Sequence, residues 1–277
     1  MSAPELARAV DTVTPDLALE ARGVTVRFGG LVALADVTVG VPPGTIVGLV
    51  GPNGAGKTTL FGVMSGLLRP NQGEVFLGGR RVTRATPTKR ARLGLARTFQ
   101  QLELFMGLTV REHLVLAYRV RNSRHRLWSD LATFGSIHPA SDAEQERVDR
   151  LLALLGLESV ANVLASSLPL GTSRRVEVGR ALANGPTVVL LDEPSSGLDA
   201  AETSHLAAAL RTVVEEEQVA LLLVEHDVAM VLGLSQRVHV LDFGQKIAEG
   251  TPDEVRNDPA VRAAYLGDDE AVEGTNA

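Results

Sequence analysis

Hydrophobic residues alternate with polar ones in the first part of the chain. Between residues 17 and 41 the apolar positions fall in short stretches with a period of two, such as Val24 with Val26. This spacing predicts antiparallel strands joined by a turn at residues 28–30. The run at 45–50 is apolar, β-branched and uninterrupted, which is typical of a strand buried on both faces.

Strand and helix patterns alternate in the last third of the chain. Short apolar runs predict strands at 188–191, 219–224 and 238–241, and helical spacing predicts helices at 200–217 and 228–234. Strands that alternate with helices are typical of a mostly parallel sheet. We therefore expect an α/β fold in which helices cover a parallel sheet.

The middle of the chain has helical spacing over residues 109–155. Ser141 and Glu144 form a capping box, which predicts the start of one helix in this stretch. The helical stretch interrupts the alternation of strands and helices. We therefore expect an inserted helical subdomain at about residues 105–165.

Composition excludes several classes of site. The chain has 277 residues, enough for one large or two small domains, and it contains no cysteine. The absence of cysteine excludes thiolate metal sites and thiol nucleophiles. The 33 acidic residues exceed the 27 Lys and Arg residues, which gives a formal net charge of −6. Because a nucleic-acid backbone is bound by a basic face, this charge disfavours nucleic acid as a partner.

The two ends of the chain differ in character from the rest. Residues 1–16 are mixed and polar and residues 268–277 are acidic, so we expect flexible segments at both ends. The N-terminal residues lack the apolar core of a signal peptide. Apolar runs such as 219–224 are far shorter than the roughly 18 residues of a membrane-spanning helix. These features predict a cytoplasmic protein.

A glycine-rich loop carries the clearest motif of the sequence. It lies between the predicted strand at 45–50 and a predicted helix at 57–68, as the phosphate-binding motif G-x-x-x-x-G-K-[ST] requires. Glycine lets the backbone N–H groups wrap a phosphate closely, Lys57 can bridge the β- and γ-phosphates, and the Thr58 hydroxyl can bind Mg²⁺. The predicted nucleotide-binding residues are Gly51, Pro52, Asn53, Gly54, Ala55, Gly56, Lys57, Thr58 and Thr59.

Two carboxylates at the end of a predicted strand supply further chemistry. Asp192 and Glu193 follow the apolar run at 188–191. Asp192 can hold Mg²⁺ through its water shell, and Glu193 is placed to polarise an attacking water. Side chains alternate in direction along a strand, so the two acids can serve different purposes. The chain contains no Asn-Lys-x-Asp sequence that would read guanine, which disfavours a GTPase.

Further motifs, in family order from about Leu17 to Gly267, resemble those of the ATP-binding subunit of an ABC transporter. The resemblance implies that Phe28 stacks on adenine. It also implies that Gln100 senses the γ-phosphate and Mg²⁺, and that His226 contacts the γ-phosphate. Asp199 ends the segment that the family calls the D-loop, which begins four residues earlier.

The same resemblance implies a fold and a way of working. The implied fold class is α/β, a P-loop NTPase core of the ABC type with an N-terminal antiparallel β subdomain and an inserted helical subdomain, within one domain over residues 17–267. The implied cofactors are ATP and Mg²⁺. Two copies, or this chain with a second ATP-binding subunit, sandwich two ATP molecules head to tail. The implied catalytic residues are Lys57, Gln100, Glu193 and His226, and the implied metal ligands are Thr58, Gln100 and Asp192.

The family signature, Leu-Ser-x-Gly-Gln, departs from its usual form in this chain. It aligns with residues 168–172, where Gly171 is retained, Pro169 replaces Ser and Thr172 replaces Gln. In the family, the signature caps the γ-phosphate held by the opposite subunit. Proline offers neither a hydroxyl nor an N–H, which would weaken that cap. Alternatively, the Gly171 N–H or the Thr172 hydroxyl suffices together with the helix N-terminus. The sequence leaves both alternatives open.

Within the family, the chain most resembles the larger ATPase of branched-chain (hydrophobic) amino acid importers. The resemblance rests on residues 28–31, 97–100, 104–110, 224–227 and 264–267. It implies an ATPase motor on the inner face of the cell membrane. Its implied partners are transmembrane permease subunits, a second ATP-binding subunit and, indirectly, a solute-binding protein. ATPases of urea uptake and lipopolysaccharide export share many of these residues, and a non-transport ABC ATPase is a further alternative.

Overall fold

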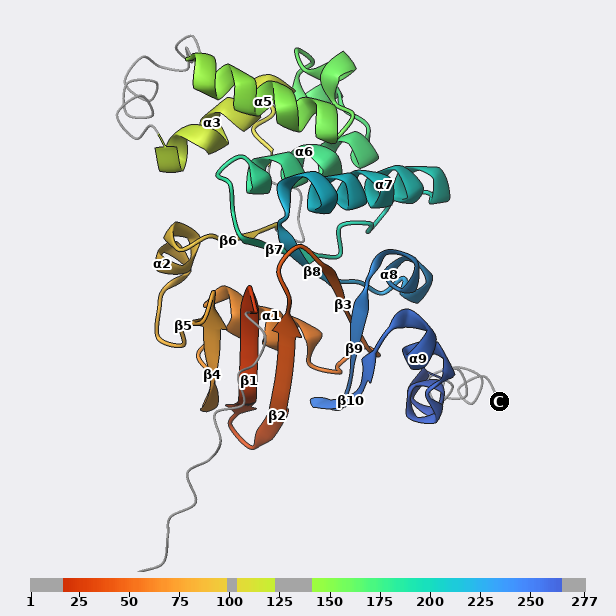
Figure 1. Cartoon of the computed structure of the whole chain (residues 1–277). Helices are drawn as coiled ribbons and strands as arrows, with labels where there is room; N and C mark the ends of the chain where they lie inside the picture. Colours follow the sequence, from red (N-terminus) through yellow and green to blue (C-terminus); the bar gives the residue numbers. More distant parts are fainter. Residues whose placement is uncertain (1–16, 99–103, 123–140, 266–277) are drawn as a thin grey trace, which may run out of the picture.

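Two β-sheets form the framework of the chain (Figure 1). The computed structural model describes residues 17–98, 104–122 and 141–265, so the predicted flexible ends lie outside the described residues. One sheet has the strand order β2-β1-β4-β5 and the other the order β10-β9-β3-β8-β7-β6. The strands are β1 (Leu19–Phe28), β2 (Leu31–Val41), β3 (Ile46–Val50), β4 (Gln72–Leu77), β5 (Arg80–Arg81), β6 (Leu95–Arg97), β7 (Val188–Asp192), β8 (Ala220–Val224), β9 (Arg237–Asp242) and β10 (Gln245–Gly250).

The first sheet is antiparallel, as the period-two pattern predicts. β1 pairs with β2 from Leu19 opposite Val41 to Phe28 opposite Leu31, and it pairs with β4 along its other edge. The turn between β1 and β2 contains Gly29, whose φ of 58° favours glycine. One face of this sheet packs on a core of buried apolar side chains.

The second sheet is mostly parallel, which confirms the prediction from alternating strands and helices. β9, β3, β8, β7 and β6 run parallel, whereas β10 runs antiparallel to β9. All residues of β3 and β8 are buried, because the sheet is covered on both faces. The hydrophobic pattern did not predict β6, which has three residues, or β10, in which only Gly250 is fully buried.

Helices cover both faces of the second sheet (Figure 1). Helix α1 packs between the two sheets, and α3, α5, α6 and α7 pack with one another on the opposite face. Within the described ranges, no helix is both long enough and apolar enough to cross a bilayer. The helices are α1 (Lys57–Ser65), α2 (Pro87–Arg92), α3 (Val110–Asn122), α5 (Asp142–Leu154), α6 (Leu170–Leu182), α7 (Ala200–Glu217), α8 (Val228–Leu234) and α9 (Pro252–Asn257), with 3₁₀ turns at Glu158–Val160 and Ala165–Ser167.

The side chains of β3 show how one strand serves two cores. Ile46 and Val50 belong to the core that contains the α3, α5, α6 and α7 side chains. Val47 and Leu49 point the other way, into the core formed with α1 and the antiparallel sheet. Because β3 leads directly into the glycine-rich loop, packing on both faces fixes the position at which that loop begins.

Helix α1 is shorter than the sequence pattern predicts. It ends at Ser65, three residues early, because Gly66 adopts a left-handed C-cap with a φ of 86°. The fully buried guanidinium of Arg90 donates to the carbonyl oxygens of Val63 and Met64, both at 2.7 Å. A cation at this end of a helix complements the helix dipole. Burial lowers the pKa of Arg90 to about 10.

The predicted helical stretch at 109–155 contains α3 and α5, and residues 123–140 between them lie outside the described residues. The Ser141 N–H donates to the Glu144 carboxylate at 2.9 Å, which confirms the predicted capping box. The same carboxylate forms an ion pair of 2.9 Å with Arg119 of α3, and both side chains are fully buried. This pair fixes how α3 and α5 meet.

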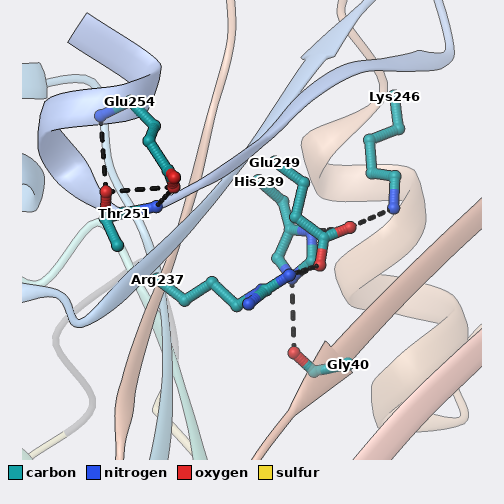
Figure 2. Close-up of polar contacts among 7 residues, drawn as sticks. All are labelled: Gly40, Arg237, His239, Lys246, Glu249, Thr251 and Glu254. Atoms are coloured by element: carbon teal, nitrogen blue, oxygen red, sulfur yellow. Dashed lines mark hydrogen bonds and ion pairs between the residues drawn. The ribbon is translucent and has the colours of Figure 1, made fainter.

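A cluster of charges on the β9–β10 hairpin connects it to the first sheet (Figure 2). Glu249 accepts from Arg237 Nε at 2.8 Å and forms an ion pair with Lys246. His239 Nδ1 lies 3.5 Å from Glu249 Oε2, and His239 Nε2 lies 3.3 Å from the Gly40 carbonyl oxygen of β2. Contact with His239, supported by Lys246, holds the pKa of Glu249 far below its usual range. Next in the chain, Thr251 and Glu254 cap α9.

Candidate active site

Three parallel strands that lie side by side end at the candidate active site. In the sheet, β8 lies between β3 and β7. The glycine-rich loop follows β3, Glu193 follows β7, and Glu225 and His226 follow β8. Because parallel strands end at the same edge of a sheet, this strand order brings the three segments together.

The loop between β3 and α1 depends on glycine at three positions. Gly51, Gly54 and Gly56 have φ values of 154°, 80° and 101°. A Cβ atom on Gly51 would lie 2.1 Å from the Leu241 carbonyl oxygen, and one on Gly56 would lie 2.7 Å from Leu34 Cδ2. Gly54 has open space around it, so only its backbone conformation requires glycine. The loop is therefore held closely against β2 and β9.

The N-terminus of α1 is open to an anion. Its N-cap residue is Gly56, no side chain caps it, and its first turn contains no acidic residue. Backbone N–H groups in the first turn of a helix and the helix dipole both attract negative charge. Of the predicted nucleotide-binding residues, Asn53 and Thr58 are exposed and Thr59 is half-buried. This end of α1 therefore has the properties of a phosphate site.

Lys57 places a positive charge inside the loop. Its side chain is buried, and Nζ donates to the Gly51 carbonyl oxygen and, at 2.9 Å, to that of Pro52. Burial lowers the pKa of Lys57, and the nearby charge of Glu193 acts in the opposite direction. A buried ammonium that bonds only to neutral carbonyls of its own loop has charge available for a bound phosphate.

Glu193 and His226 form a contact pair at the ends of β7 and β8. His226 Nε2 lies 2.5 Å from Glu193 Oε1. Glu193 has a left-handed φ of 46°, and its N–H donates to the Val224 carbonyl oxygen at 2.8 Å. This unusual conformation is held by a backbone bond to β8. A carboxylate here can accept a proton from water, and an imidazole can donate to a phosphate oxygen.

Asp192 and Thr58 carry oxygen atoms of the kind that bind a magnesium ion, and both are predicted metal ligands. Burial raises the pKa of Asp192, and the charge of Glu193 raises it further. A cation would relieve this repulsion between neighbouring acids. The described residues contain no group of three acidic or histidine side chains that could enclose a metal. Mg²⁺ usually keeps several waters and binds through one or two side chains together with phosphate oxygens.

Two further predicted residues lie at the edge of this centre or outside the described part. Phe28 ends β1 and is 51% exposed. Its hairpin is tied to the loop through the β9–β10 turn, because the Ala35 N–H donates to the Gly244 carbonyl and the Gly244 N–H donates to the Ala55 carbonyl, at 2.8 and 3.0 Å. Gln100 lies outside the described residues.

The structure brings Gly171 and Asp199 together through a residue that the sequence analysis did not consider. Gly171 is in the first turn of α6, whose N-cap is Pro169. Its N–H donates to Glu202 Oε1 at 3.2 Å. The other carboxylate oxygen of Glu202 accepts the Asp199 N–H at 3.3 Å in a capping box at the start of α7. Within the described residues, no hydrogen bond or ion pair joins either residue to the glycine-rich loop.

Sequence reasoning also assigned no role to Glu225. Glu225 is buried, with only 3% of the residue exposed, and burial raises the pKa of its carboxyl group. It accepts the Ser195 N–H at 2.7 Å and the His226 N–H at 3.3 Å. Glu225 therefore joins the segment after Glu193 to the backbone of His226. An acid directly after an apolar strand and before a candidate histidine was the signal that could have identified it.

Comparison with known proteins places this geometry among nucleotide-binding subunits of transporters. Residues 34–196 match the family model described as ABC transporter, and residues 245–271 match one described as branched-chain amino acid ATP-binding cassette transporter. The chain is 37% identical over 250 residues to the high-affinity branched-chain amino acid transport ATP-binding protein LivG of Escherichia coli (strain K12), covering 90% of this chain and 98% of LivG. It is 36% identical over 253 residues to BraF of Pseudomonas aeruginosa, with the same coverage.

A more distant relative and a solved structure extend the comparison. The chain is 34% identical over 250 residues to the lipopolysaccharide export system ATP-binding protein LptB of Acidithiobacillus ferridurans, covering 90% of this chain and 97% of LptB. The fold is similar to a crystal structure of the ADP conformation of an ATP-binding cassette of an ABC transporter. The TM-score is 0.77 at 28% identity, with 91% of this chain and 99% of the other covered.

Proposed function

Because this chain belongs to the ABC transporter family, we propose that it is the ATP-hydrolysing subunit of an importer for branched-chain or other hydrophobic amino acids. The convergence of Lys57, Glu193 and His226 at the ends of three neighbouring strands is the observation that carries the hydrolytic part. The match of residues 245–271 and the similarity to LivG and BraF along nearly their whole length support the substrate class.

The residues of the centre divide the chemistry among them. The open N-terminus of α1 and the Lys57 ammonium bind the β- and γ-phosphates. Glu193 orients and polarises the attacking water, while His226 donates to a γ-phosphate oxygen. Mg²⁺, when bound, neutralises charge on the phosphates, and Asp192 and Thr58 would hold it. Gln100 is a further proposed ligand of the metal, and Phe28 stacks on the adenine.

Two ATP-binding subunits work together in this proposal. A second copy of the chain, or a homologous ATPase, places its signature on the nucleotide of this chain, and Gly171 and Asp199 serve the partner's nucleotide. We take residues 17–267 as a single ATP-binding domain with a helical subdomain inserted at about 105–165. The buried side chains of the inserted helices share one core with a face of the second sheet, which supports a single domain.

A cleft between the second sheet and the inserted helices suits a permease. It has a volume of about 650 Å³ and is lined by α2 and β6 on one side and by α3 and α6 on the other. Its lining is largely apolar and includes Ala91, Leu95, Ala117, Val120 and Ala181. An amphipathic helix can dock its apolar face in such a groove. We assign the cleft to a cytoplasmic helix of the transmembrane permease subunits, and we propose that this chain acts at the inner face of the membrane.

The alternatives are an ATPase for another solute and a non-transport ABC ATPase. The similarity to LptB keeps lipopolysaccharide export as the second candidate. Residues 245–271, which match the branched-chain amino acid model, favour amino-acid import. A net charge of −6 and a single glycine-rich phosphate loop disfavour an ATPase that acts on nucleic acid, as does the absence of a long heptad stretch. The solute-binding protein is an indirect partner of the proposed importer.

Reconstitution tests the proposal directly. The chain, its permease subunits, the second ATPase and the solute-binding protein encoded near it would be placed in liposomes containing ATP, and uptake of radiolabelled leucine would be measured. We expect uptake that disappears with Glu193→Gln and persists with the matched control Glu215→Gln. ATP hydrolysis that leucine and its binding protein do not stimulate, without leucine uptake, would contradict the importer function.

A further inference from the structure

Glu202 connects the start of α7 to the first turn of α6, which lies 31 residues earlier in the sequence. Its carboxylate accepts the Gly171 N–H from α6 and the Asp199 N–H from the start of α7, at 3.2 and 3.3 Å. The Glu202 N–H in turn donates to Asp199 Oδ1 at 2.8 Å, which fixes the backbone from which the carboxylate projects. Glu202 is therefore anchored at the N-terminus of α6.

Glycine at position 171 lets this carboxylate approach the backbone closely. Its backbone is not in the left-handed region, so conformation does not require glycine. A Cβ atom at position 171 would lie 2.8 Å from Glu202 Oε1 and 2.9 Å from its Cδ. A second close contact supports the same approach, since a Cβ on Gly197 would lie 3.0 Å from Leu170 Cδ2. The first turn of α6 and the segment leading into α7 are thus built to touch.

Pro169 explains why α6 accepts a cap from another helix. A serine at the N-cap position would offer its own oxygen to the first-turn N–H groups, but Pro169 has no such atom, and no side chain of the cap residue serves them. Glu202 supplies an oxygen instead, from 31 residues away. The surviving donor of the signature, the Gly171 N–H, is already in use within the chain.

We propose that the Glu202 carboxylate competes with the phosphate of the partner's nucleotide for the first turn of α6, so that it sets how tightly the ATP sandwich closes. This inference rests on the proposed function, because only a sandwich brings a phosphate to this turn. Two negative charges at one helix N-terminus repel each other, and each interacts with the same N–H groups and dipole. Closure of the ATP sandwich therefore requires the Glu202 side chain to move away from the first turn of α6. If the side chain stays there, its charge lowers the affinity of the two subunits for each other.

Arg175 of α6 interacts electrostatically with Glu202. However, Arg175 Nη1 donates to the carbonyl oxygens of Leu155 and Gly156 at 2.9 and 3.0 Å, and Nη2 lies 3.4 Å from Thr172 Oγ1. These bonds hold the guanidinium, and within the described residues no ion pair or hydrogen bond joins it to Glu202. The two charges therefore interact only through space, and the carboxylate keeps a charge that can act on an arriving phosphate.

The test measures ATP-dependent dimerisation in a Glu193→Gln background, in which bound ATP is not consumed. Glu202→Gln keeps the shape and the oxygen that accepts the Gly171 N–H but removes the charge. The matched control Glu215→Gln removes one charge from an exposed position near the other end of the same helix. Sedimentation with MgATP at low and high salt would give the dimer dissociation constant of each variant, alone and with the second ATPase.

We expect Glu202→Gln to tighten the ATP-dependent dimer by about 2- to 5-fold at low salt, the range for one charge at a helix N-terminus. The difference should shrink at high salt, because screening weakens charge repulsion. Glu215→Gln should match the parent. If Glu202→Gln dimerises no more tightly than the parent at both salt concentrations, this inference is overturned but the proposed sandwich is not. A dimer absent from every variant, with either partner, would overturn the sandwich and this inference with it.

Discussion

The N-termini of α1 and α6 are built differently, although both are proposed to face a nucleotide phosphate. At α1 the cap residue is Gly56, no acid lies in the first turn, and the buried Lys57 adds positive charge. At α6 the cap residue is Pro169, and a carboxylate from α7 takes the Gly171 N–H. One helix end is left open for an anion, and the other already holds one.

In the proposed function, this difference separates a permanent binding site from one that two subunits share. The α1 site attracts phosphate whether or not another subunit is present, because all its positive groups come from one loop and one helix. The α6 site gains a phosphate only when a partner brings it, and in the separate chain the turn is satisfied by Glu202. A cap from within the chain keeps α6 intact between encounters.

Removing the water-polarising carboxylate would produce the largest effect and would confirm that hydrolysis depends on the α1 side of the comparison. Glu193→Gln should lower the ATPase rate by about 100- to 10,000-fold, the usual range for a general base. ATP affinity should stay near that of the parent, since the substitution keeps shape and position. Steady-state hydrolysis and equilibrium binding of a fluorescent ATP analogue would measure the two quantities. Hydrolysis at the parental rate would show that Glu193 is not the base.

Removing the buried ammonium breaks the α1 site at the binding step. Lys57→Ala should weaken ATP binding by about 10- to 150-fold, because a charge-assisted contact contributes roughly 1.5–3 kcal/mol. Isothermal titration would give the dissociation constant. Lys89→Ala, which removes an equal charge from an exposed position in α2, is the control and should bind ATP like the parent. Similar affinity in Lys57→Ala and the parent would contradict the assigned role of the ammonium.

Filling the space at Gly171 breaks the α6 side instead. Gly171→Ala should lower the free energy of unfolding by about 1–2 kcal/mol, because the new Cβ displaces Glu202 and removes a helix cap. Urea unfolding followed by circular dichroism would measure the change. Gly233→Ala in α8, where a Cβ meets nothing within 4 Å, should instead leave stability unchanged or raise it by up to about 1 kcal/mol. A decrease in the free energy of unfolding that occurs in Gly233→Ala and not in Gly171→Ala would contradict the packing described at α6.

The pH dependence of stability tests the support behind the α1 loop. The pKa of folded Glu249 lies far below its usual value, so its contribution is present above the unfolded pKa of about 4.3 and is lost as the pH falls below it. Glu249→Gln should lower the free energy of unfolding by about 1 kcal/mol at neutral pH, with a smaller difference from the parent near about pH 3.5. A difference in the free energy of unfolding between parent and variant that stays the same from neutral pH to about pH 3.5 would contradict the role given to Glu249.

The chemistry of the α1 site could be proposed from the sequence because that site is local. Its glycine spacing, Lys57 and the flanking strand and helix are contiguous, so one motif in its context defines them. The parallel sheet was predicted from short apolar runs that alternate with helical segments. Segments without a clear apolar pattern were missed: α2 reads Pro-Thr-Lys-Arg-Ala-Arg, and β10 has a single fully buried residue. Helix α1 was predicted too long because Leu67 and Leu68 continue the apolar pattern past Gly66.

The α6 site could not be predicted in the same way, because it depends on contacts between distant segments. Glu202 meets Gly171 across 31 residues, and Glu225 meets Ser195 across 30. Neither spacing has a local signature. The order in which β3, β8 and β7 pair is also set by the packing of the whole sheet rather than by any single strand. The roles of Phe28, Gln100 and the altered signature stay predictions.

The closeness of Gly171 and Glu202 constrains the order in which this protein can change during evolution. While a glutamate occupies position 202, the Cβ of any side chain at 171 lies within 3 Å of its carboxylate group. Substitution of Gly171 is therefore selected against as long as Glu202 is present. Replacement of Glu202 by a shorter residue removes the two closest contacts and leaves the contact of 3.1 Å with the Cβ of residue 202, which reduces the penalty on substitution at 171. Lineages descending from this sequence should therefore lose the acid before they lose the glycine, and recovery of the acid should become harder once the glycine has gone.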